Sequence, residues 1–423
     1  MTAHTDGTAE QAVVAPKGSD IDLTGDENSA TESLEALLTT LERFWPDSSA
    51  TVATRGARAI GPGPQFVAIP RARHPRLLIP SESRRASAVA MRRYSSALSI
   101  REAALRWAVS LGIRAGGPRL VGDPIRVLAT PGTESLDDYL STVIGERVTF
   151  SISVGSRRVN RKPVLQVFGG GGQSLAFAKI GDSSAAAEHV TAEGRALERL
   201  SQRTMRDLDV PRLLHLGEWN HMTVLVMSPM HTGPFQRPWR RHHPPATQMR
   251  ALTAAFDEGQ RTLDDTDWWR RTRAVIERLK GSEDGRAYEA LASRVLELAA
   301  GRSWTIGAWH GDWTSWNMAW RRDVLQVWDW ERFETGVPAG LDLYHFVVND
   351  MVQRKGLDVA TIHAALVEVG GRPDDQRARA SVLGGVYLLT VAGRYLDAAH
   401  GERGDAIRDR ASTTLEALIR WLD

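Results

Sequence analysis

The chain of 423 residues contains no cysteine. This absence excludes disulfide bonds, thiolate nucleophiles and zinc sites built on cysteine ligands. Long apolar runs are also lacking. The best candidate, residues 380–393, lies between two arginines and is shorter than the roughly 20 residues that a membrane-spanning helix needs. We therefore expect a buried helix there and no transmembrane segment.

Positive and negative charges are also nearly balanced. The chain has 53 Lys and Arg residues against 51 Asp and Glu residues, a formal net charge of +2. This balance is too mild to indicate nucleic acid on its own. The N-terminus has no basic segment followed by an apolar one, so we expect no secretion signal and a cytoplasmic protein. A hydrophobic content of 42% with 25% charged residues is ordinary for a globular protein.

One polar motif combines residue types that phosphoryl transfer needs. His310, Gly311 and Asp312 are followed by Asn317, and Asp329 ends the next apolar run. Phosphoryl transfer needs a carboxylate that accepts a proton from the attacking hydroxyl. It also needs amide and carboxylate oxygens that hold Mg²⁺ against the nucleotide phosphates. Protein kinases use the same Asp-to-Asn spacing, with arginine in place of Gly311.

The residues around this motif predict a hairpin. Residues 317–320 and 324–328 are compatible with β-strands, and the polar residues 321–323 lie between them. Such a hairpin brings Asn317 and Asp329 to the same end, where both could bind one Mg²⁺ ion through oxygen atoms. The alternative is a surface loop with incidental acidic residues. Several identities at fixed offsets favour the site.

At these residues the chain resembles a known family. Residues 305–347 are similar to the catalytic and metal-binding loops of the aminoglycoside phosphotransferase and choline kinase superfamily, which has a bilobed protein-kinase-like fold. That family has H-G-D-x-x-x-x-N, then an Asp before Trp or Phe, and then an Asp-Leu pair, here Asp342-Leu343. The resemblance is weaker over residues 146–230 and absent before about residue 140.

The resemblance implies a role for each matching residue. Asp312 would be the catalytic base. Asn317 and Asp329 would hold Mg²⁺. His310 and Asp342 would brace the catalytic loop without reacting.

Alternating patterns before this motif predict the small lobe. We expect strands at 147–154, 163–168, 175–180, 210–214 and 222–227, and a helix at 183–200. The link at 155–162 occupies the position of a loop that covers the nucleotide. It has one glycine, so it departs from the G-x-G-x-x-G pattern, although its basic side chains could contact phosphates.

Three residues of this lobe are candidates for nucleotide binding. Lys179 ends the third strand, where a kinase needs a cation beside the α- and β-phosphates. A helix carboxylate must orient this cation, and Glu193 opens a segment similar to the family's E-x-x-x-L-x-x-L helix, so we choose it over Glu188. A surface lysine and a solvated glutamate are the plainer alternatives. Met230 lies where such folds place the hinge that contacts adenine.

Together with these strand and helix patterns, the resemblance implies an α+β fold that is bilobed and protein-kinase-like. The small lobe has an antiparallel sheet, the large lobe is rich in α-helices, and an N-terminal extension precedes both. The expected divisions are a disordered tail at 1–30, an extension of mixed helix and strand at 31–145, the small lobe at 146–230, and the large lobe with the catalytic loop and acceptor site at 231–423.

The predicted function is an ATP- and Mg²⁺-dependent phosphotransferase. It would act on a hydroxyl of a small molecule, such as a sugar, an amino sugar or a related metabolite. Protein substrates are disfavoured because the D-F-G and A-P-E sequences are lacking after Asp329. The Arg- and His-rich segment 231–250 speaks against a polycationic acceptor. GTP in place of ATP stays open, as does the oligomeric state.

Two alternatives belong to other classes. The first is a catalytically silent kinase-like module that binds nucleotide or a partner. It would not need the base Asp312, so the full set of motif residues argues against it. The second is binding of nucleic acid or an acidic membrane through the arginine-rich helix predicted at 81–111. A solvated helix face explains these arginines better, so we expect no nucleic-acid partner.

Overall fold

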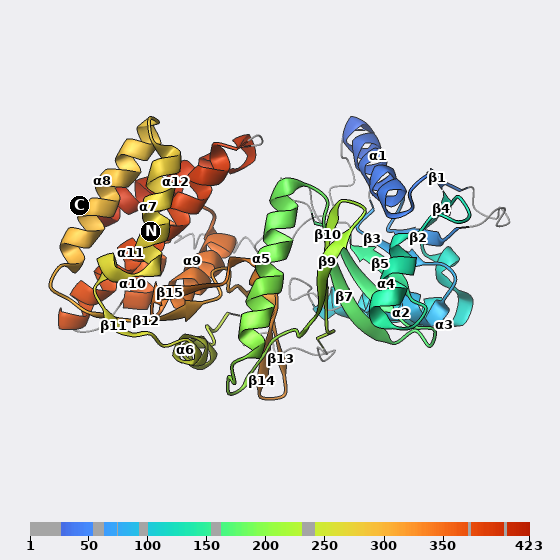
Figure 1. Cartoon of the computed structure of the whole chain (residues 1–423), viewed down its shortest axis with the longest axis horizontal. Coiled ribbons are helices and arrows are strands. Elements are labelled where there is room, and N and C mark those ends of the chain that lie inside the picture. Colours follow the sequence, from blue (N-terminus) through green and yellow to red (C-terminus); the bar gives the residue numbers. More distant parts are fainter. Residues whose placement is uncertain are drawn as a thin grey trace, which may run out of the picture.

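The computed structural model describes residues 27–53, 63–73, 75–92, 100–153, 162–230, 242–370, 374–401 and 404–423. Two lobes lie next to each other along the long axis of the molecule, and helix α5 (Ser184–Ser201) lies between them (Figure 1). The predicted disordered tail, residues 1–30, falls mostly outside the described residues. Helix α1 begins at Glu27, within that predicted tail.

The small lobe is built on one antiparallel sheet of nine strands, in the order β1-β4-β2-β3-β5-β6-β7-β10-β9. The strands are β1 (Ser49–Val52), β2 (Gln65–Ile69), β3 (Leu77–Pro80), β4 (Asp123–Leu128), β5 (Thr149–Ser153), β6 (Val164–Phe168), β7 (Ser174–Gly181), β9 (Leu213–Trp219) and β10 (Met222–Met227). Each of the five strands predicted between residues 147 and 227 overlaps a strand of this sheet.

The N-terminal extension belongs to the same sheet as the small lobe. Strand β3 pairs with β5, with Leu78 opposite Ile152, so the sheet continues across the expected boundary near residue 146. The two parts also share a core. The ring of Trp45, just after α1, stacks on Phe150 of β5 with their centroids 5.6 Å apart, and Phe66 of β2 lies 6.1 Å from Phe150. The extension is therefore an enlargement of the small lobe.

Four helices cover this part of the sheet. They are α1 (Glu27–Phe44), α2 (Arg84–Met91), α3 (Ile100–Gly116) and α4 (Leu136–Ile144), and a 3-10 turn, η1 (Pro118–Leu120), follows α3. The stretch predicted to be helical at 81–111 contains both α2 and the start of α3. Ser83 caps α2 by accepting a hydrogen bond from the backbone of Ala86.

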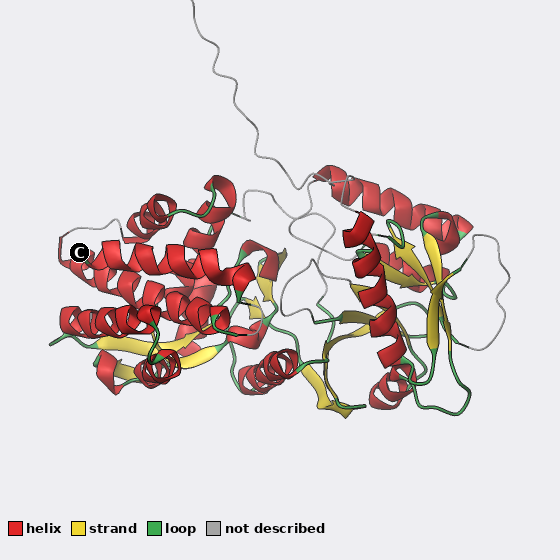
Figure 2. Cartoon of the chain, turned by 90° about the horizontal axis from the view of Figure 1, so that it is seen from above, coloured by secondary structure: helices red, strands yellow, loops and turns green. Residues whose placement is uncertain are grey.

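The large lobe is mostly helical, as Figure 2 shows. Its helices are α6 (Ala246–Ala255), α7 (Asp267–Leu279), α8 (Glu283–Ala299), α9 (Leu341–Lys355), α10 (Val359–Gly370), α11 (Asp374–Ala399) and α12 (Asp405–Leu422). Its strands are β11 (Gly259–Arg261), β12 (Trp304–Trp309) and β15 (Glu334–Pro338) in one sheet, and β13 (Met318–Arg321) and β14 (Val324–Val327) in the predicted hairpin.

The apolar stretch 380–393 forms the middle of α11. Its residues Val386, Leu389 and Ala392 are fully buried in the core of the large lobe, as expected from the sequence. No helix within the described ranges is long and apolar enough to cross a membrane.

The lobes meet where α5 contacts the loop after the hairpin. This loop contains the 3-10 turn η5 (Trp330–Arg332), which packs against α5. The two-residue strand β8 (Leu208–Asp209), a short distance after α5, pairs in parallel with β14. Leu197 of α5, Leu225 of β10 and Trp330 of η5 share one buried cluster. The joint between the lobes is therefore a packed core, and the predicted catalytic residues surround it.

Candidate active site

The predicted catalytic loop begins directly after β12. The backbone N–H groups of His310 and Gly311 donate to the carboxylate of Asp342, at 2.8 and 3.1 Å. Gly311 has φ +79°, and a Cβ atom there would lie 2.3 Å from the carbonyl oxygen of Arg332. Only glycine fits this close approach. Burial raises the pKa of Asp342 to about 7, although the two backbone hydrogen bonds oppose this rise.

His310 is fully buried beneath the loop. Its Nδ1 accepts the backbone N–H of Asp312 at 3.1 Å, and its Nε2 donates to the carbonyl oxygen of Trp328 at 3.1 Å. Burial lowers the pKa of His310 to about 4, so the ring is neutral and serves as one donor and one acceptor. His310 and Asp342 thus lie where residues that brace the loop are expected.

Asp312 is the candidate base, and its side chain is 37% exposed. Its Oδ2 accepts a hydrogen bond from Asn317 Nδ2 at 2.9 Å, and its Oδ1 lies 3.1 Å from His345 Nε2. Burial acts to raise the pKa of Asp312, but the hydrogen bond and charge of His345 hold it below its usual value. The carboxylate is therefore ionised at neutral pH, as a base must be.

The hairpin brings the two predicted metal ligands together. The backbone N–H of Trp328 donates to the carbonyl oxygen of Asn317 at 3.0 Å, so Asn317 and Asp329 lie at the open end of the hairpin. The nitrogen of the Asn317 amide binds Asp312, which leaves its oxygen as the atom that could contact a cation. Asp329 has φ +73°, a left-handed conformation uncommon for residues other than glycine.

Lys179 connects the two lobes. It lies on β7, and its Nζ is 2.5 Å from Glu193 Oε2 on α5 and 2.6 Å from Asp329 Oδ1 in the large lobe. Burial alone would lower the pKa of Lys179, but the two carboxylates hold it above its usual value. In turn, the charge of Lys179 overcomes burial and lowers the pKa of Asp329 to about 2. The structure therefore places Glu193 against Lys179.

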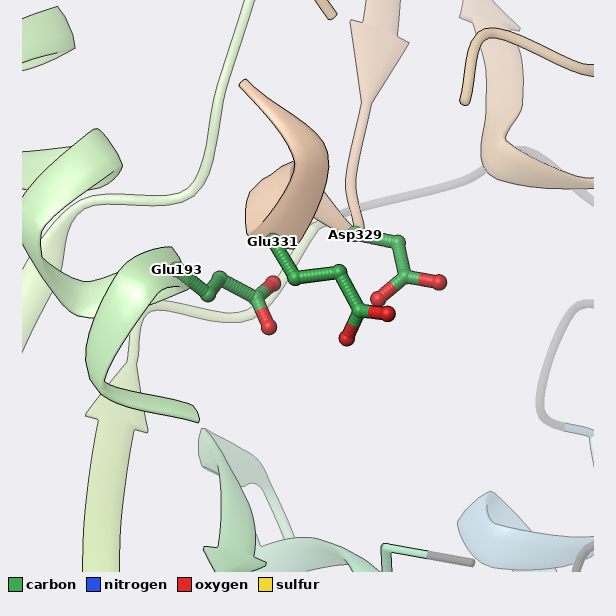
Figure 3. Close-up of side chains that lie close together, drawn as sticks. All are labelled: Glu193, Asp329 and Glu331. Carbon is green, nitrogen blue, oxygen red and sulfur yellow. The ribbon is translucent and has the colours of Figure 1, made fainter. Parts of the chain in front are cut away.

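A third carboxylate joins Glu193 and Asp329. Glu331 lies within 4.8 Å of both, counted between their carboxylate oxygens. Figure 3 shows Glu193 reaching from α5, with Asp329 and Glu331 coming from the segment at η5 toward the same space. Lys162, just before β6, forms an ion pair with Glu331. Burial lowers the pKa of Lys162 to about 8.

This cluster suits a hydrated divalent cation. The carboxylate oxygens of Glu193, Asp329 and Glu331 are the kind of ligand that Mg²⁺ takes, usually through one or two carboxylates together with phosphates and water. The sequence motif gave Glu331 no role. Its position two residues after Asp329 is the signal that could have found it.

Two predicted features lie at the edges of the described ranges. Met230 is half-buried and follows β10, on the chain that leads toward the large lobe. Its contact with adenine stays a prediction. The predicted nucleotide-covering loop lies outside the described residues except for Lys162, and so does much of the basic segment 231–250.

Two further residues of the large lobe, His345 and Arg394, contact the predicted catalytic loop. His345 of α9 contacts Asp312, as described above. Arg394 of α11 donates to the carbonyl oxygen of Gly311 at 2.9 Å and lies 3.1 Å from Glu334. Motif spacing did not reveal them. However, His345 lies three residues after Asp342, on the same helix face, which is a usable signal.

The chain matches no family model, and no curated protein matches its sequence. The solved structures to which it is similar include several phosphotransferases. The aminoglycoside phosphotransferase APH(4)-Ia has 14% identity, covers 68% of this chain and 97% of its own, and gives a TM-score of 0.46. The macrolide 2'-phosphotransferase MphH from Brachybacterium faecium has 16% identity to this chain. It covers 66% of this chain and 95% of its own, and it gives a TM-score of 0.38.

The third structure is APH(2")-IIa in complex with gentamicin. It has 14% identity to this chain, covers 67% of this chain and 93% of its own, and gives a TM-score of 0.39. All three belong to the superfamily of aminoglycoside phosphotransferases and protein-kinase-like proteins. The two lobes and the contacts between them are seen in the structure of this chain itself.

Proposed function

We propose that this chain is a phosphotransferase that moves the γ-phosphoryl group of ATP to a hydroxyl of a small molecule, with Mg²⁺ as cofactor. One observation carries the proposal. The Nζ atom of Lys179 lies 2.5 Å from a carboxylate oxygen of the buried Glu193, which also belongs to the small lobe. It lies 2.6 Å from a carboxylate oxygen of Asp329, which belongs to the large lobe. A cation and carboxylates from opposite lobes therefore meet at one point. Phosphoryl transfer needs this combination of charges around the nucleotide phosphates.

The small-lobe side of the site binds the nucleotide in this proposal. Lys179 contacts the α- and β-phosphates, and Glu193 orients it. Asn317 and Asp329 hold Mg²⁺, which would neutralise charge on the phosphates when bound. Met230 marks the hinge near adenine. The rates of such reactions come from positioning and electrostatics, so the lack of a cysteine nucleophile is no obstacle.

The large-lobe side of the site binds the acceptor. Asp312 is ionised and 37% exposed, so an acceptor hydroxyl can reach it. As the acceptor oxygen bonds to the γ-phosphorus, the bond from that phosphorus to the bridging oxygen breaks and ADP leaves. The O–H bond of the acceptor also breaks, and its proton passes to Asp312. His310 and Asp342 keep the loop in place through backbone hydrogen bonds. A sugar, an amino sugar or a related metabolite is the proposed acceptor class.

A panel of acceptors with labelled ATP and Mg²⁺ tests this function directly. Wild type and Asp312→Asn are compared at equal concentration, and nucleotide affinity is measured for both. We expect transfer to fall by about 10³-fold or more in Asp312→Asn, because general base catalysis contributes about 10²–10⁴-fold and the position of the acceptor is also lost. Nucleotide affinity should stay within about twofold, a margin of only about 0.4 kcal/mol.

The outcomes separate the enzyme from a silent module. Equal turnover in both proteins would refute Asp312 as the base. Nucleotide binding without transfer to any acceptor in the wild type would favour the kinase-like binding module instead. Asp323→Asn is a suitable control because Asp323 lies in the turn between β13 and β14, outside the proposed site. It should leave transfer unchanged.

A further inference from the structure

His345 touches Asp312 from the side of the large lobe. It lies on α9 and is 5% exposed, and its Nε2 is 3.1 Å from Asp312 Oδ1. The other carboxylate oxygen, Oδ2, accepts from Asn317 Nδ2 at 2.9 Å. Both oxygens of the carboxylate are therefore held by nitrogen atoms from different segments. Two such contacts fix the plane of the carboxylate, which a single contact would leave free to rotate.

The surroundings of His345 hold its ring in place. The ring lies edge-on to Trp309, with centroids 6.4 Å apart, and edge-on to Tyr387, with centroids 5.9 Å apart. Asn349, one helical turn further along α9, donates to the carbonyl oxygen of His345 at 2.9 Å. The imidazole thus has packed neighbours on β12, α9 and α11, and it cannot turn away without disturbing the core.

The contacts of Nε2 require a proton on that ring nitrogen. Nε2 lies 3.1 Å from the carboxylate of Asp312 and 3.1 Å from Asn349 Nδ2. A carboxylate oxygen only accepts, and a hydrogen bond to an ion is about twice as strong as a neutral one. Nε2 therefore carries the proton and donates it to Asp312. The hydroxyl of Tyr387 lies 3.5 Å from the other ring nitrogen, Nδ1.

We propose that His345 is a positioning residue for the transfer reaction, which acts by holding the Asp312 carboxylate at the angle that the acceptor hydroxyl requires. This inference rests on the proposed function, because it gives Asp312 the role of base. His345 itself touches neither the acceptor nor the nucleotide. Its loss should therefore lower kcat while nucleotide affinity stays the same. A misplacement of about 1 Å in such a group can lower a rate by about 10²-fold.

The test compares two substitutions of His345. His345→Leu keeps an apolar side chain in the pocket and removes the donor. His345→Gln keeps an N–H group that can reach Asp312. We measure kcat and KM for transfer, the slow hydrolysis of ATP by water, nucleotide Kd and the melting temperature. His363→Leu is the matched control, because His363 of α10 is also partly buried but donates to the carbonyl oxygen of Ala417.

We expect His345→Leu to lower kcat by about 10- to 100-fold, with nucleotide Kd within about twofold of wild type. His345→Gln should recover at least a third of the wild-type kcat, and His363→Leu should keep all of it. Wild-type kcat in His345→Leu would overturn the inference. So would a His345→Gln variant as slow as His345→Leu with the same melting temperature, because the donor would then have no part in the effect.

A second measurement needs neither acceptor nor nucleotide. Nitrogen NMR of protein labelled at histidine should show a protonated Nε2 for His345, with its signal identified by the loss of that signal in His345→Gln. A protonated Nδ1 with a bare Nε2 would overturn the inference. If the wild type neither transfers phosphate nor hydrolyses ATP, the proposed function fails and this inference with it. An active wild type with an equally active His345→Leu variant would overturn this inference alone.

Discussion

The two lobes hold the charged groups of the candidate site in different ways. On the small-lobe side, Lys179 is 12% exposed and Glu193 is fully buried, and the two form an ion pair. On the large-lobe side, Asp312 is 37% exposed and is held by Asn317 and His345. A buried charge is costly unless it is paired, whereas a base must remain open to its substrate. Stability should therefore depend on the first side, and turnover on the second.

The largest effect on stability is expected for Lys179→Met. This substitution leaves Glu193 as an uncompensated buried charge, which should lower the free energy of unfolding by about 3–5 kcal/mol. Urea unfolding of wild type and variant measures the loss. In the double variant Lys179→Met with Glu193→Leu, part of the stability should return because the charge is gone. A single variant within about 1 kcal/mol of wild type would contradict the proposed burial of this pair.

A smaller effect is expected from Asp342, which should make the free energy of unfolding depend on pH. Its pKa in the folded chain, about 7, lies above that of an unfolded aspartate. Between about pH 4 and 7 the folded state keeps a proton that the unfolded state has lost. Stability therefore falls as pH rises, by up to about 1.4 kcal/mol per pH unit, and this fall ends above about pH 7.

Urea unfolding at several pH values, in wild type and Asp342→Asn, isolates this contribution. Other groups titrate in both proteins. The difference between the two plots of unfolding free energy against pH therefore reports the titration of Asp342. We expect the difference to change across pH 4–7 and to stay constant above it. A difference that is constant over the whole range would show that Asp342 is ionised in the fold and that the two backbone hydrogen bonds outweigh its burial.

The smallest effect on stability is expected for Asp312→Asn. The side chain is partly exposed, and asparagine is of nearly the same size, so the free energy of unfolding should change by less than about 1 kcal/mol. The same variant should lose transfer almost completely. Thermal or urea unfolding provides the measurement. A loss as large as that of Lys179→Met would mean that Asp312 is mainly a structural residue, and the contrast between the two sides would fail.

Local patterns were enough to predict most strands and the order of the lobes. Strand β10 occupies residues 222–227 as predicted, and β6 occupies 164–168, within the predicted 163–168. Apolar alternation and turn residues determine such elements within a few positions. The pairing of β3 with β5 could not be predicted in this way. Which strands become neighbours depends on packing between distant segments, and the aromatic contact of Trp45 with Phe150 is one example.

The same limit applies to the site. Lys179, Glu193 and Asp329 could be named from the sequence because each lies in a motif with defined spacing. Glu331 received no role, since its closeness to Glu193 arises only when α5 packs against η5. His345 was missed because its contact with Asp312 joins two segments, 33 residues apart, that are packed together only in the folded lobe.

The most direct test of the account is the effect of Mg²⁺ on nucleotide binding. Titration calorimetry of wild type and Asp329→Ala, each with and without Mg²⁺, measures it. The account predicts that wild type binds ATP more tightly with Mg²⁺, and that Asp329→Ala loses this gain. Equal affinities for both proteins under both conditions would contradict the claim that Lys179 and Asp329 face one nucleotide and metal site.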